Sequence, residues 1–363
     1  MIGPRRWPLH PAPVEGEVLS SWLGRVAACY GTDLEGLGAD IGLRIDRNTR
    51  DDIDLDPPSD LVDTLAERSG LTLDRLRLMT VAGNVPWLLD DMDPHPDAFG
   101  TYARQLSVLR PAGRHKPRKV PQWRPWLPPR LRTRACPGCV ANSPSPTPHL
   151  LLWGIPIVSS CPEHGCWLEE PIFTRGYVYL AASDLPQPRP APEHVLALDG
   201  RTHDAFTTGE VSLPGRTIHC GVWFRLLRTL IDELSAPLSE SRAATARTVK
   251  RVWSEAGYRT RDGQTKWYPF EHQNPSLQLH TMEAAAIAVT LLESGTINGP
   301  GTEAALFRPA PSMTIFDGTP PPPAPLASSI MRGKPTLMDS FNAAIASAQT
   351  NPEEARTLFA VAT

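Results

Sequence analysis

One feature of this 363-residue sequence limits the fold more than any other: two short Cys/His motifs near its middle. Residues 136–139 read Cys-Pro-Gly-Cys, and residues 161–164, after an interval of twenty-one residues, read Cys-Pro-Glu-His. Each motif holds two potential metal ligands two residues apart, so one tight turn can direct both side chains toward one ion. Pro137 favours such a turn, and Gly138 would allow a left-handed backbone within it. The spacing predicts a structural zinc ion bound by Cys136, Cys139, Cys161 and His164.

Other uses of these cysteines agree less well with the rest of the sequence. Disulfide frameworks are typical of exported proteins, and the N-terminus, with Arg5 and Arg6 but no apolar run after them, does not predict an export signal. A redox-active Cys-x-x-Cys would follow a strand of a larger α/β sheet, which the sequence does not predict. Cys166 remains an alternative to His164 as the fourth ligand. Four protein ligands saturate zinc, so the ion would be structural and not catalytic.

The segment between the motifs, residues 150–158, is apolar and rich in β-favouring residues. It is predicted to form a strand beside the metal, interrupted by Pro156. Together with a hairpin between the two ligand pairs, this strand predicts a small zinc ribbon over residues 135–182. Helical periodicity dominates elsewhere, so the fold class we expect is mainly α with a small zinc-ribbon β-hairpin module.

Apolar periodicity predicts helices on both sides of the zinc module. On the N-terminal side, they cover residues 18–30, residues 60–69 and a third stretch that starts after the N-cap Thr72. The last two, joined at Gly70, have the pattern of a helix-turn-helix, whose second helix would present Asp74, Arg75 and Arg77. A structural or protein-facing helix pair gives the same pattern. On the C-terminal side, the predicted helices cover residues 222–234, 243–256 and 282–293.

Forty prolines mark the joints between these parts, because a proline inside a helix costs about 3 kcal/mol. We expect a multi-domain chain, with a helix-turn-helix-like domain and a zinc finger followed by a second helical domain. Its parts are an N-terminal helical domain (1–100), a basic Pro/Trp-rich connector (101–134), the zinc-ribbon module (135–182), a C-terminal helical domain (200–305), and a Pro-rich linker with a terminal helix (306–363).

The net charge of −3 hides a strong local asymmetry. Residues 1–100 carry eighteen acids against nine arginines, whereas residues 98–162 contain ten cations and no acid. Such a segment attracts polyanions through counterion release, and arginine suits phosphate and guanine contacts. Packing of these arginines against the acidic N-terminal half is the alternative interpretation. The first interpretation predicts DNA contacts by Arg110, Arg114, Lys116, Arg118, Lys119, Arg124, Arg130, Arg132 and Arg134, and by Arg247 and Arg251 of the helix over 243–256.

Signatures of catalysis and of membrane insertion are missing from the sequence. It has no phosphate-binding loop, no nucleophile elbow and no His-Glu-x-x-His, and no His-x-Glu of the zinc deaminases precedes Cys136. It also has no run of about 18–20 apolar residues. We therefore expect a cytoplasmic protein that is not an enzyme and has no membrane partner.

Two motifs, in this order, resemble the TniQ family, the target-selection proteins of transposons. The first runs from Pro13 to Ala27 and contains Val-Leu-Ser-Ser-Trp-Leu-Gly-Arg, with Val18 where the family has serine. The second is the Cys-Pro-x-Cys motif followed by Trp153 and the segment 161–168, which is similar to the family's Cys-Pro-x-His-Gly-x-x-Leu. Residues 169–200 lack the further Cys-x-x-Cys of many relatives, so a second zinc knuckle is not expected.

The resemblance implies a helix-turn-helix plus zinc-ribbon adaptor without chemistry of its own. Such an adaptor recognises a target DNA or a guide-RNA complex and recruits an AAA+ ATPase and the transposase; a homodimer with a second copy of the chain is a further candidate. The leading hypothesis is therefore a DNA-binding target-selection adaptor for transposition. The alternative is a protein–protein interaction scaffold with a structural zinc site and no direct DNA contact.

Overall fold

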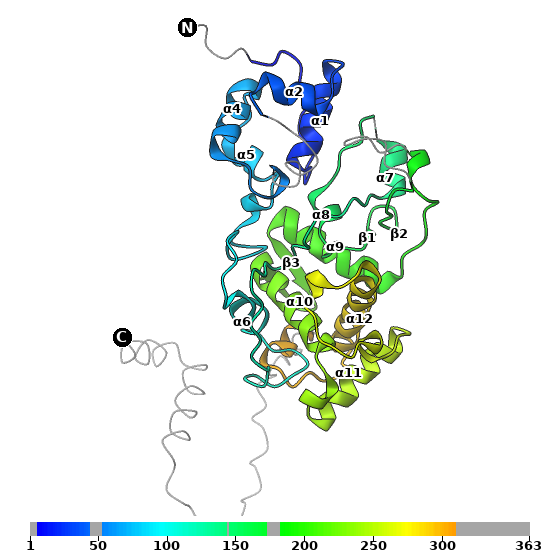
Figure 1. Cartoon of the computed structure of the whole chain (residues 1–363). Coiled ribbons are helices and arrows are strands. Elements are labelled where there is room, and N and C mark those ends of the chain that lie inside the picture. The colour runs from blue at the N-terminus through cyan, green and yellow to red at the C-terminus, as the bar shows by residue number, and fades with distance from the viewer. Residues whose placement is uncertain (1–5, 44–52, 144, 173–181, 310–363) are drawn as a thin grey trace, which may run out of the picture. The chain divides into compact units, whose positions relative to one another are not determined.

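The structure is a computed structural model and describes residues 6–43, 53–143, 145–172 and 182–309 (Figure 1). Most of the described elements are helices, as predicted, and the strands form two short antiparallel pairs. The linker and terminal helix predicted after residue 309 lie outside the described residues. The α-helices are α1 (Leu19–Cys29), α2 (Leu34–Asp40), α4 (Ser59–Ser69), α5 (Leu73–Arg77), α6 (Ala98–Ala103), α7 (Pro137–Asn142), α8 (Leu151–Gly154), α9 (Glu193–Thr208), α10 (Cys220–Ser235), α11 (Ala243–Glu255) and α12 (Pro275–Glu293). The strands are β1 (Ser160–Cys161), β2 (Cys166–Trp167), β3 (Glu210–Leu213) and β4 (Arg216–His219).

The N-terminal helices bury an apolar core of their own. Trp22 and Leu23 of α1 meet Leu65 of α4 and Leu76 of α5 in this core, and all four side chains are fully buried. The helices predicted over residues 18–30 and 60–69 are thus confirmed as α1 and α4. Helix α2 was not predicted from the periodicity, because only seven residues form it.

The corner between α4 and α5 has the local chemistry expected of it. Gly70 ends α4 in the left-handed region, with φ 78°, and the Thr72 hydroxyl accepts a hydrogen bond from the Arg75 N–H at 3.2 Å. Helix α5 has only five residues, and Arg75 donates from its guanidinium to the carbonyl of Pro13 at 3.2 Å. Asp74 and Arg77 are exposed. The helix-turn-helix assignment of this pair stays a prediction.

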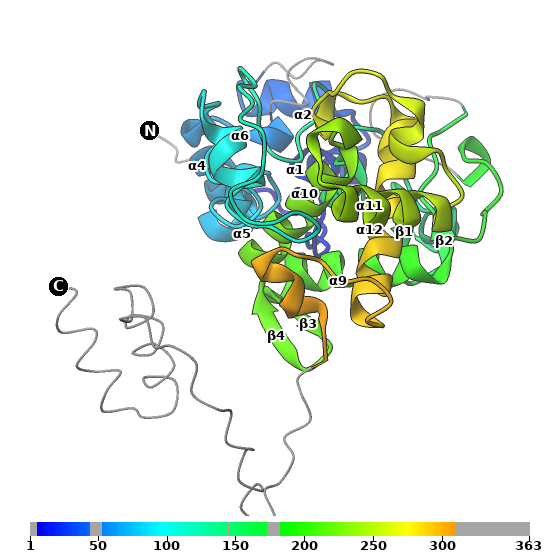
Figure 2. The same ribbon diagram turned by 90° about the horizontal axis from the view of Figure 1, so that it is seen from below.

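The connector, the Cys/His module and the C-terminal helices share a second apolar core. Four tryptophans with at most 1 % exposure fill it: Trp123 and Trp126 of the connector, Trp223 of α10 and Trp253 of α11. Helix α12 packs against α9, α10 and α11 (Figure 2). The connector therefore supplies two of the largest buried side chains of the molecule's C-terminal half.

The segment between the two Cys/His motifs differs from the prediction. Residues 150–158 form no strand: one helical turn, α8, is followed by irregular chain whose Ile155 and Ile157 are fully buried. A continuous apolar run shows only that a segment is buried, and Pro156 cannot donate to a strand ladder. The hairpin of this module, β1–β2, encloses the second motif and does not lie between the two motifs.

The predicted C-terminal helices are present with shifted bounds. Helices α10 and α11 match the expected ranges closely, but α12 begins at Pro275, seven residues earlier than predicted, because Asn274 caps it by accepting from the Leu277 N–H. Helix α9 and the β3–β4 hairpin that follows it were not predicted. Two buried polar residues, Asp199 and Thr202, interrupt the apolar stripe of α9 and hide its periodicity.

Candidate metal centre and nucleic-acid interface

Three thiols and one imidazole converge at one point of the structure. The donor atoms of Cys136, Cys139, Cys161 and His164 all lie within 4.8 Å of one another. The Cys139 Sγ is 3.7 Å from the Cys161 Sγ and 3.4 Å from His164 Nδ1, and Cys161 Sγ is 3.6 Å from the same nitrogen. Tetrahedral zinc with Zn–S bonds of about 2.3 Å places its ligands at similar separations. The cluster predicted from the spacing is therefore present, and it can hold a metal ion.

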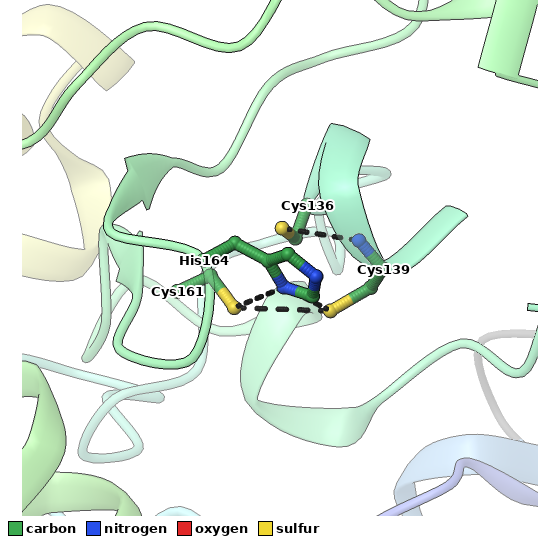
Figure 3. A group of neighbouring side chains, drawn as sticks. All are labelled: Cys136, Cys139, Cys161 and His164. Carbon is green, nitrogen blue, oxygen red and sulfur yellow. Dashed lines mark hydrogen bonds between the residues drawn. The ribbon is translucent and has the colours of Figure 1, made fainter. Parts of the chain in front are cut away.

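Two different local structures supply the two ligand pairs (Figure 3). Cys136 is the N-cap of α7, where its Sγ accepts from the Cys139 N–H at 3.4 Å, and Pro137 occupies the first helical position. Cys161 ends β1, and His164 lies in the turn between β1 and β2. A helix start and a hairpin turn thus face each other across the ligand atoms.

Gly138 has a different role from the one expected. Its φ is not positive, so the expectation of a left-handed backbone at this position is wrong. A Cβ at residue 138 would instead lie 2.4 Å from Cδ2 of His164, far inside van der Waals contact. Glycine is needed here because the imidazole packs directly against the backbone of α7.

Cys166 lies beside the cluster without being part of it. Its Sγ is 3.5 Å from the Cys136 Sγ, but the four-donor group consists of the predicted ligands. The geometry of the cluster therefore favours His164 over Cys166 as the fourth ligand.

Neighbouring residues hold the ligand-bearing loops in place. The Asn142 amide lies 3.2 Å from Nε2 of His164, on the opposite side of the ring from the sulfur atoms. The buried carboxylate of Asp199 on α9 accepts from the backbone N–H groups of Ser159 and Ser160 at 2.9 and 2.7 Å, next to Cys161. Such partners orient metal ligands and are part of a working site. Sequence spacing did not indicate either residue, because neither lies within a motif.

The N-terminal motif that resembles the TniQ opening is physically joined to this module. Gly16 accepts from the Leu151 N–H at 2.8 Å, and the Val18 N–H donates to the carbonyl of His149 at 3.0 Å. The Ser21 hydroxyl accepts from the His149 N–H and donates to the buried carboxylate of Glu17. The motif residues therefore connect α1 to the chain that leads into the second Cys/His motif.

Arg25 completes this junction. Its guanidinium donates to both oxygens of Glu17, at 2.8 and 2.7 Å, and Glu17 is fully buried. Breaking one partner of a buried ion pair is strongly destabilising. The arginine and glutamate of the motif thus have a structural role.

Several of the cations predicted to touch DNA turn inward. Arg110 and Arg134 are only 3 % and 6 % exposed, and Arg134 donates to the carbonyls of Trp153 and Ile155. Burial lowers the pKa of Arg134 to about 9. Arg132 is hydrogen-bonded to Gln278, and Arg118 pairs with Glu240 at 2.9 Å. These four side chains have contacts within the protein.

The acids that receive the connector come from the C-terminal half and not from the acidic N-terminal half. Glu233 of α10 accepts from the backbone N–H groups of residues 108–110 and lies 2.9 Å from His115 Nε2. Glu271 accepts from the indole of Trp123, the Trp126 N–H and the guanidinium of Arg228. The acid-free window is therefore compensated more than a hundred residues further along the chain.

The remaining predicted contacts keep their charge at the surface. Arg124 is half-buried, and the predicted cations classed as exposed are Arg114, Lys116, Lys119, Arg130, Arg247 and Arg251. On α11, Val252 and Trp253 face inward as expected, so Arg247 and Arg251 lie on the outer side of the helix. These exposed cations are the ones that remain available to a polyanion.

Comparison with known proteins finds a family match for the N-terminal part of the chain. Residues 8–168, which include both motifs and all four ligands of the cluster, match the sequence model of the TniQ family. This part of the chain belongs to the TniQ family. No curated protein and no solved structure matches the chain. Among the described helices, none has the length and apolar character needed to span a membrane.

Proposed function

We propose that this chain is a non-catalytic target-selection protein of transposition, which binds DNA and recruits an AAA+ ATPase and a transposase. The observation that carries the proposal is the TniQ match over residues 8–168, which spans both motifs. A role without chemistry is supported by the donor set, because three thiolates and an imidazole leave a tetrahedral ion no open position for substrate.

The metal of this proposal is zinc, held by Cys136, Cys139, Cys161 and His164. The donor set and the separations support it, since soft thiolates with one imidazole select zinc among common divalent ions. Zinc content of the purified protein, measured by inductively coupled plasma mass spectrometry, tests the assignment. We expect one ion per chain, loss of that ion in Cys136→Ser and His164→Ala, and no change in Cys29→Ser, whose thiol is exposed. Full occupancy in both ligand variants contradicts the assignment.

The DNA contacts of this proposal are the exposed cations of the connector and of α11. Lys119 and Arg130 have no ion pair among the described residues, and Arg247 and Lys250 share the outer side of α11. Each phosphate contact releases counterions, so binding should weaken steeply as salt rises. The inward-facing arginines are proposed to support the fold and to make no base or phosphate contact, except as argued for Arg110 below.

A salt titration of duplex binding by fluorescence anisotropy tests the DNA proposal. In the double variants Lys119→Ala/Arg130→Ala and Arg247→Ala/Lys250→Ala, we expect weaker DNA binding. The slope of log K against the logarithm of the salt concentration should also become shallower, by roughly 1 for each phosphate contact that is lost. Arg308→Ala, an exposed arginine outside the predicted set, is the matched control. Absence of binding at low salt would reject direct DNA contact.

A second candidate function is a scaffold that binds proteins and touches no DNA. The observation that favours it is the pairing of connector cations with acids, such as Arg104 with Asp232 at 3.5 Å and Arg118 with Glu240. Under this alternative, a pull-down with the ATPase or with a guide-RNA complex succeeds and is insensitive to the exposed-cation variants. Loss of the salt-dependent DNA binding but not of the pull-down in those variants supports the adaptor function.

A further inference from the structure

We propose that a cavity at the N-terminus of α11 is a binding site for a phosphate group. The cavity has a volume of about 370 Å³, and Arg110, Arg114 and Arg242 line it together with Ser241. The inference deepens the proposed DNA binding if the phosphate belongs to a nucleic-acid backbone, and in that case it rests on the proposed function. It stands independently if the ligand is a free phosphate.

The charge of the cavity is strongly positive. Glu240 is the one carboxylate in its lining, and the oxygens of Glu240 are already engaged by Arg118 at 2.9 Å and Lys116 at 3.6 Å. Within the described part of the chain, no carboxylate forms an ion pair with Arg110, Arg114 or Arg242. Three uncompensated guanidinium groups around one small cavity favour an anion with several acceptor oxygens.

Arg110 is the feature that points most directly to a ligand. The residue is only 3 % exposed to solvent, and one of its guanidinium nitrogens donates a hydrogen bond to the Ser241 hydroxyl at 2.8 Å. Its Nε is buried and has no hydrogen-bond partner in the described structure. A buried charge without a counter-charge is costly, so a guanidinium in this position is expected where an anion completes it.

Helix α11 adds a second, independent source of positive potential. It has thirteen residues, its N-cap is Arg242, and no side chain caps its first turn. Its first turn also contains no acid. The first backbone N–H groups of a helix lack partners within the helix, and the helix dipole places partial positive charge at this end. A helix N-terminus flanked by arginines is a common arrangement for phosphate.

The cavity continues into the surface already proposed to meet DNA. Arg114 and Arg242 are exposed at its rim, while Arg247 and Lys250 follow on the outer side of the same helix. A backbone phosphate in the cavity would therefore position the strand along α11. Phosphate contacts of this kind fix the register of a protein on DNA without reading its sequence.

The decisive variant is Arg242→Asp. Aspartate is a favoured N-cap residue, so the change should keep or increase the stability of α11 while it reverses the charge at the mouth of the cavity. Arg242→Asn is the matched control for capping alone, and Arg308→Ala is the control for the loss of an exposed arginine. Arg110→Met removes the buried guanidinium, and its fold is checked separately by circular dichroism.

The probe is inorganic phosphate, added to about 10 mM to the full-length protein at constant ionic strength and followed by isothermal titration calorimetry and by the melting temperature. We expect saturable binding and a raised melting temperature for the unmodified chain, loss of both in Arg242→Asp, and at least severalfold weaker binding in Arg110→Met and in Arg242→Asn. Equal phosphate binding by the unmodified chain and by Arg242→Asp overturns the proposal, as does no binding by either.

The affinity of the same variants for duplex DNA shows whether the phosphate belongs to DNA or is free. A loss of DNA affinity in Arg242→Asp that parallels the loss of phosphate binding assigns the site to a DNA phosphate. Unchanged DNA affinity with lost phosphate binding assigns it to a free phosphate. If DNA binds but phosphate does not, and Arg242→Asp leaves the affinity unchanged, the site is wrong and the proposed function stands. If phosphate binds but DNA does not, the site stands and the DNA proposal fails.

Discussion

The imidazole of His164 rests against a backbone position that has no room for a side chain. Because a Cβ at residue 138 would lie 2.4 Å from the ring, either the ring or the first turn of α7 has to move if one is introduced. The ring is itself a proposed ligand and the first turn of α7 bears two others, so a side chain at residue 138 would also disturb the ligand geometry. Proline and cysteine in the same motif act differently, by fixing the helix start and by donating sulfur.

Gly138→Ala is therefore expected to reduce metal affinity by about tenfold or more, in the range seen when residues that orient metal ligands are changed. Competition with a chromophoric zinc chelator measures the effect. Gly100→Ala is the control, because Gly100 lies in α6 with open space around its Cα and an ordinary φ. An unchanged affinity in Gly138→Ala would contradict the contact with His164.

Asp199 makes stability depend on pH. Burial raises its pKa from 3.8 to about 6 in the folded chain. Between about pH 4 and pH 6, the folded state then holds a proton that the unfolded state releases, so the contribution of this group to stability falls as pH rises through that window. At about 1.4 kcal/mol per pKa unit, the change amounts to at most about 3 kcal/mol.

Asp199→Asn should remove this dependence, since an amide does not ionise and its oxygen can still accept from Ser159 and Ser160. The measurement is urea unfolding of both proteins at pH 4.5, 5.5 and 7. The free-energy difference between them should shift in favour of the variant as pH increases. A difference that is constant across the three pH values would show that Asp199 does not titrate in this range.

At the scale of elements, the connector is held to the C-terminal helices by two buried carboxylates. Glu271 accepts hydrogen bonds from the guanidinium of Arg228, the Trp123 indole and the Trp126 backbone N–H. Glu233 accepts hydrogen bonds from three consecutive backbone N–H groups of the connector. Neither attachment depends on the connector having regular secondary structure. A segment with six prolines among residues 111–129 can therefore be a fixed part of the core.

Glu271→Ala is expected to destabilise the fold by about 3–5 kcal/mol, because it leaves the guanidinium of Arg228 buried and unpaired. Chemical denaturation followed by tryptophan fluorescence measures the loss, since Trp123 and Trp126 report on this core. Glu255→Ala is the control: Glu255 on α11 is exposed, and its pair with Arg251 at 3.8 Å should contribute less than about 1 kcal/mol. Similar losses in both variants would contradict a special role for Glu271.

The same elements show what a sequence can predict. The Cys/His cluster was predictable because its spacing is local, and α1, α4, α10 and α11 were predictable because one apolar face of each is buried. The sequence does not predict helix α9, because buried Asp199 and Thr202 interrupt its apolar stripe. Residues 150–158 do not form the strand that their composition predicts, because a fully buried run has no period that distinguishes a strand from a helix. The inward turn of Arg110 and Arg134 could not be predicted, since their partners are set by tertiary packing.

At the scale of the whole molecule, the metal module links two cores. The chain at residues 16–18 pairs with residues 149–151, so α1 and the segment between the ligand pairs share backbone hydrogen bonds. The first core contains the N-terminal helices and the second contains the connector and the C-terminal helices. Loss of order at the metal centre should therefore reach the junction before it reaches α11.

Removal of the metal by a chelator should accordingly speed hydrogen exchange at the Val18 and Leu151 amides, whose partners are the carbonyls of His149 and Gly16. The amide of Val252, inside α11, serves as an internal reference that should change little. Hydrogen exchange with mass spectrometric detection, with and without chelator, makes the comparison. Equal acceleration at the reference and the junction would indicate global unfolding instead.

The long-range pairing of the connector has a consequence for the order in which the chain acquires its structure during synthesis. Arg104 is separated from Asp232 by 128 residues, and Arg118 from Glu240 by 122. A ribosome therefore releases the basic segment well before the acids that neutralise it exist. Until α10 has emerged, these arginines are exposed beside ribosomal RNA, itself a polyanion. On the nascent chain, the basic segment is therefore free to bind nucleic acid unselectively. The C-terminal half ends this exposure when its acids pair with the arginines.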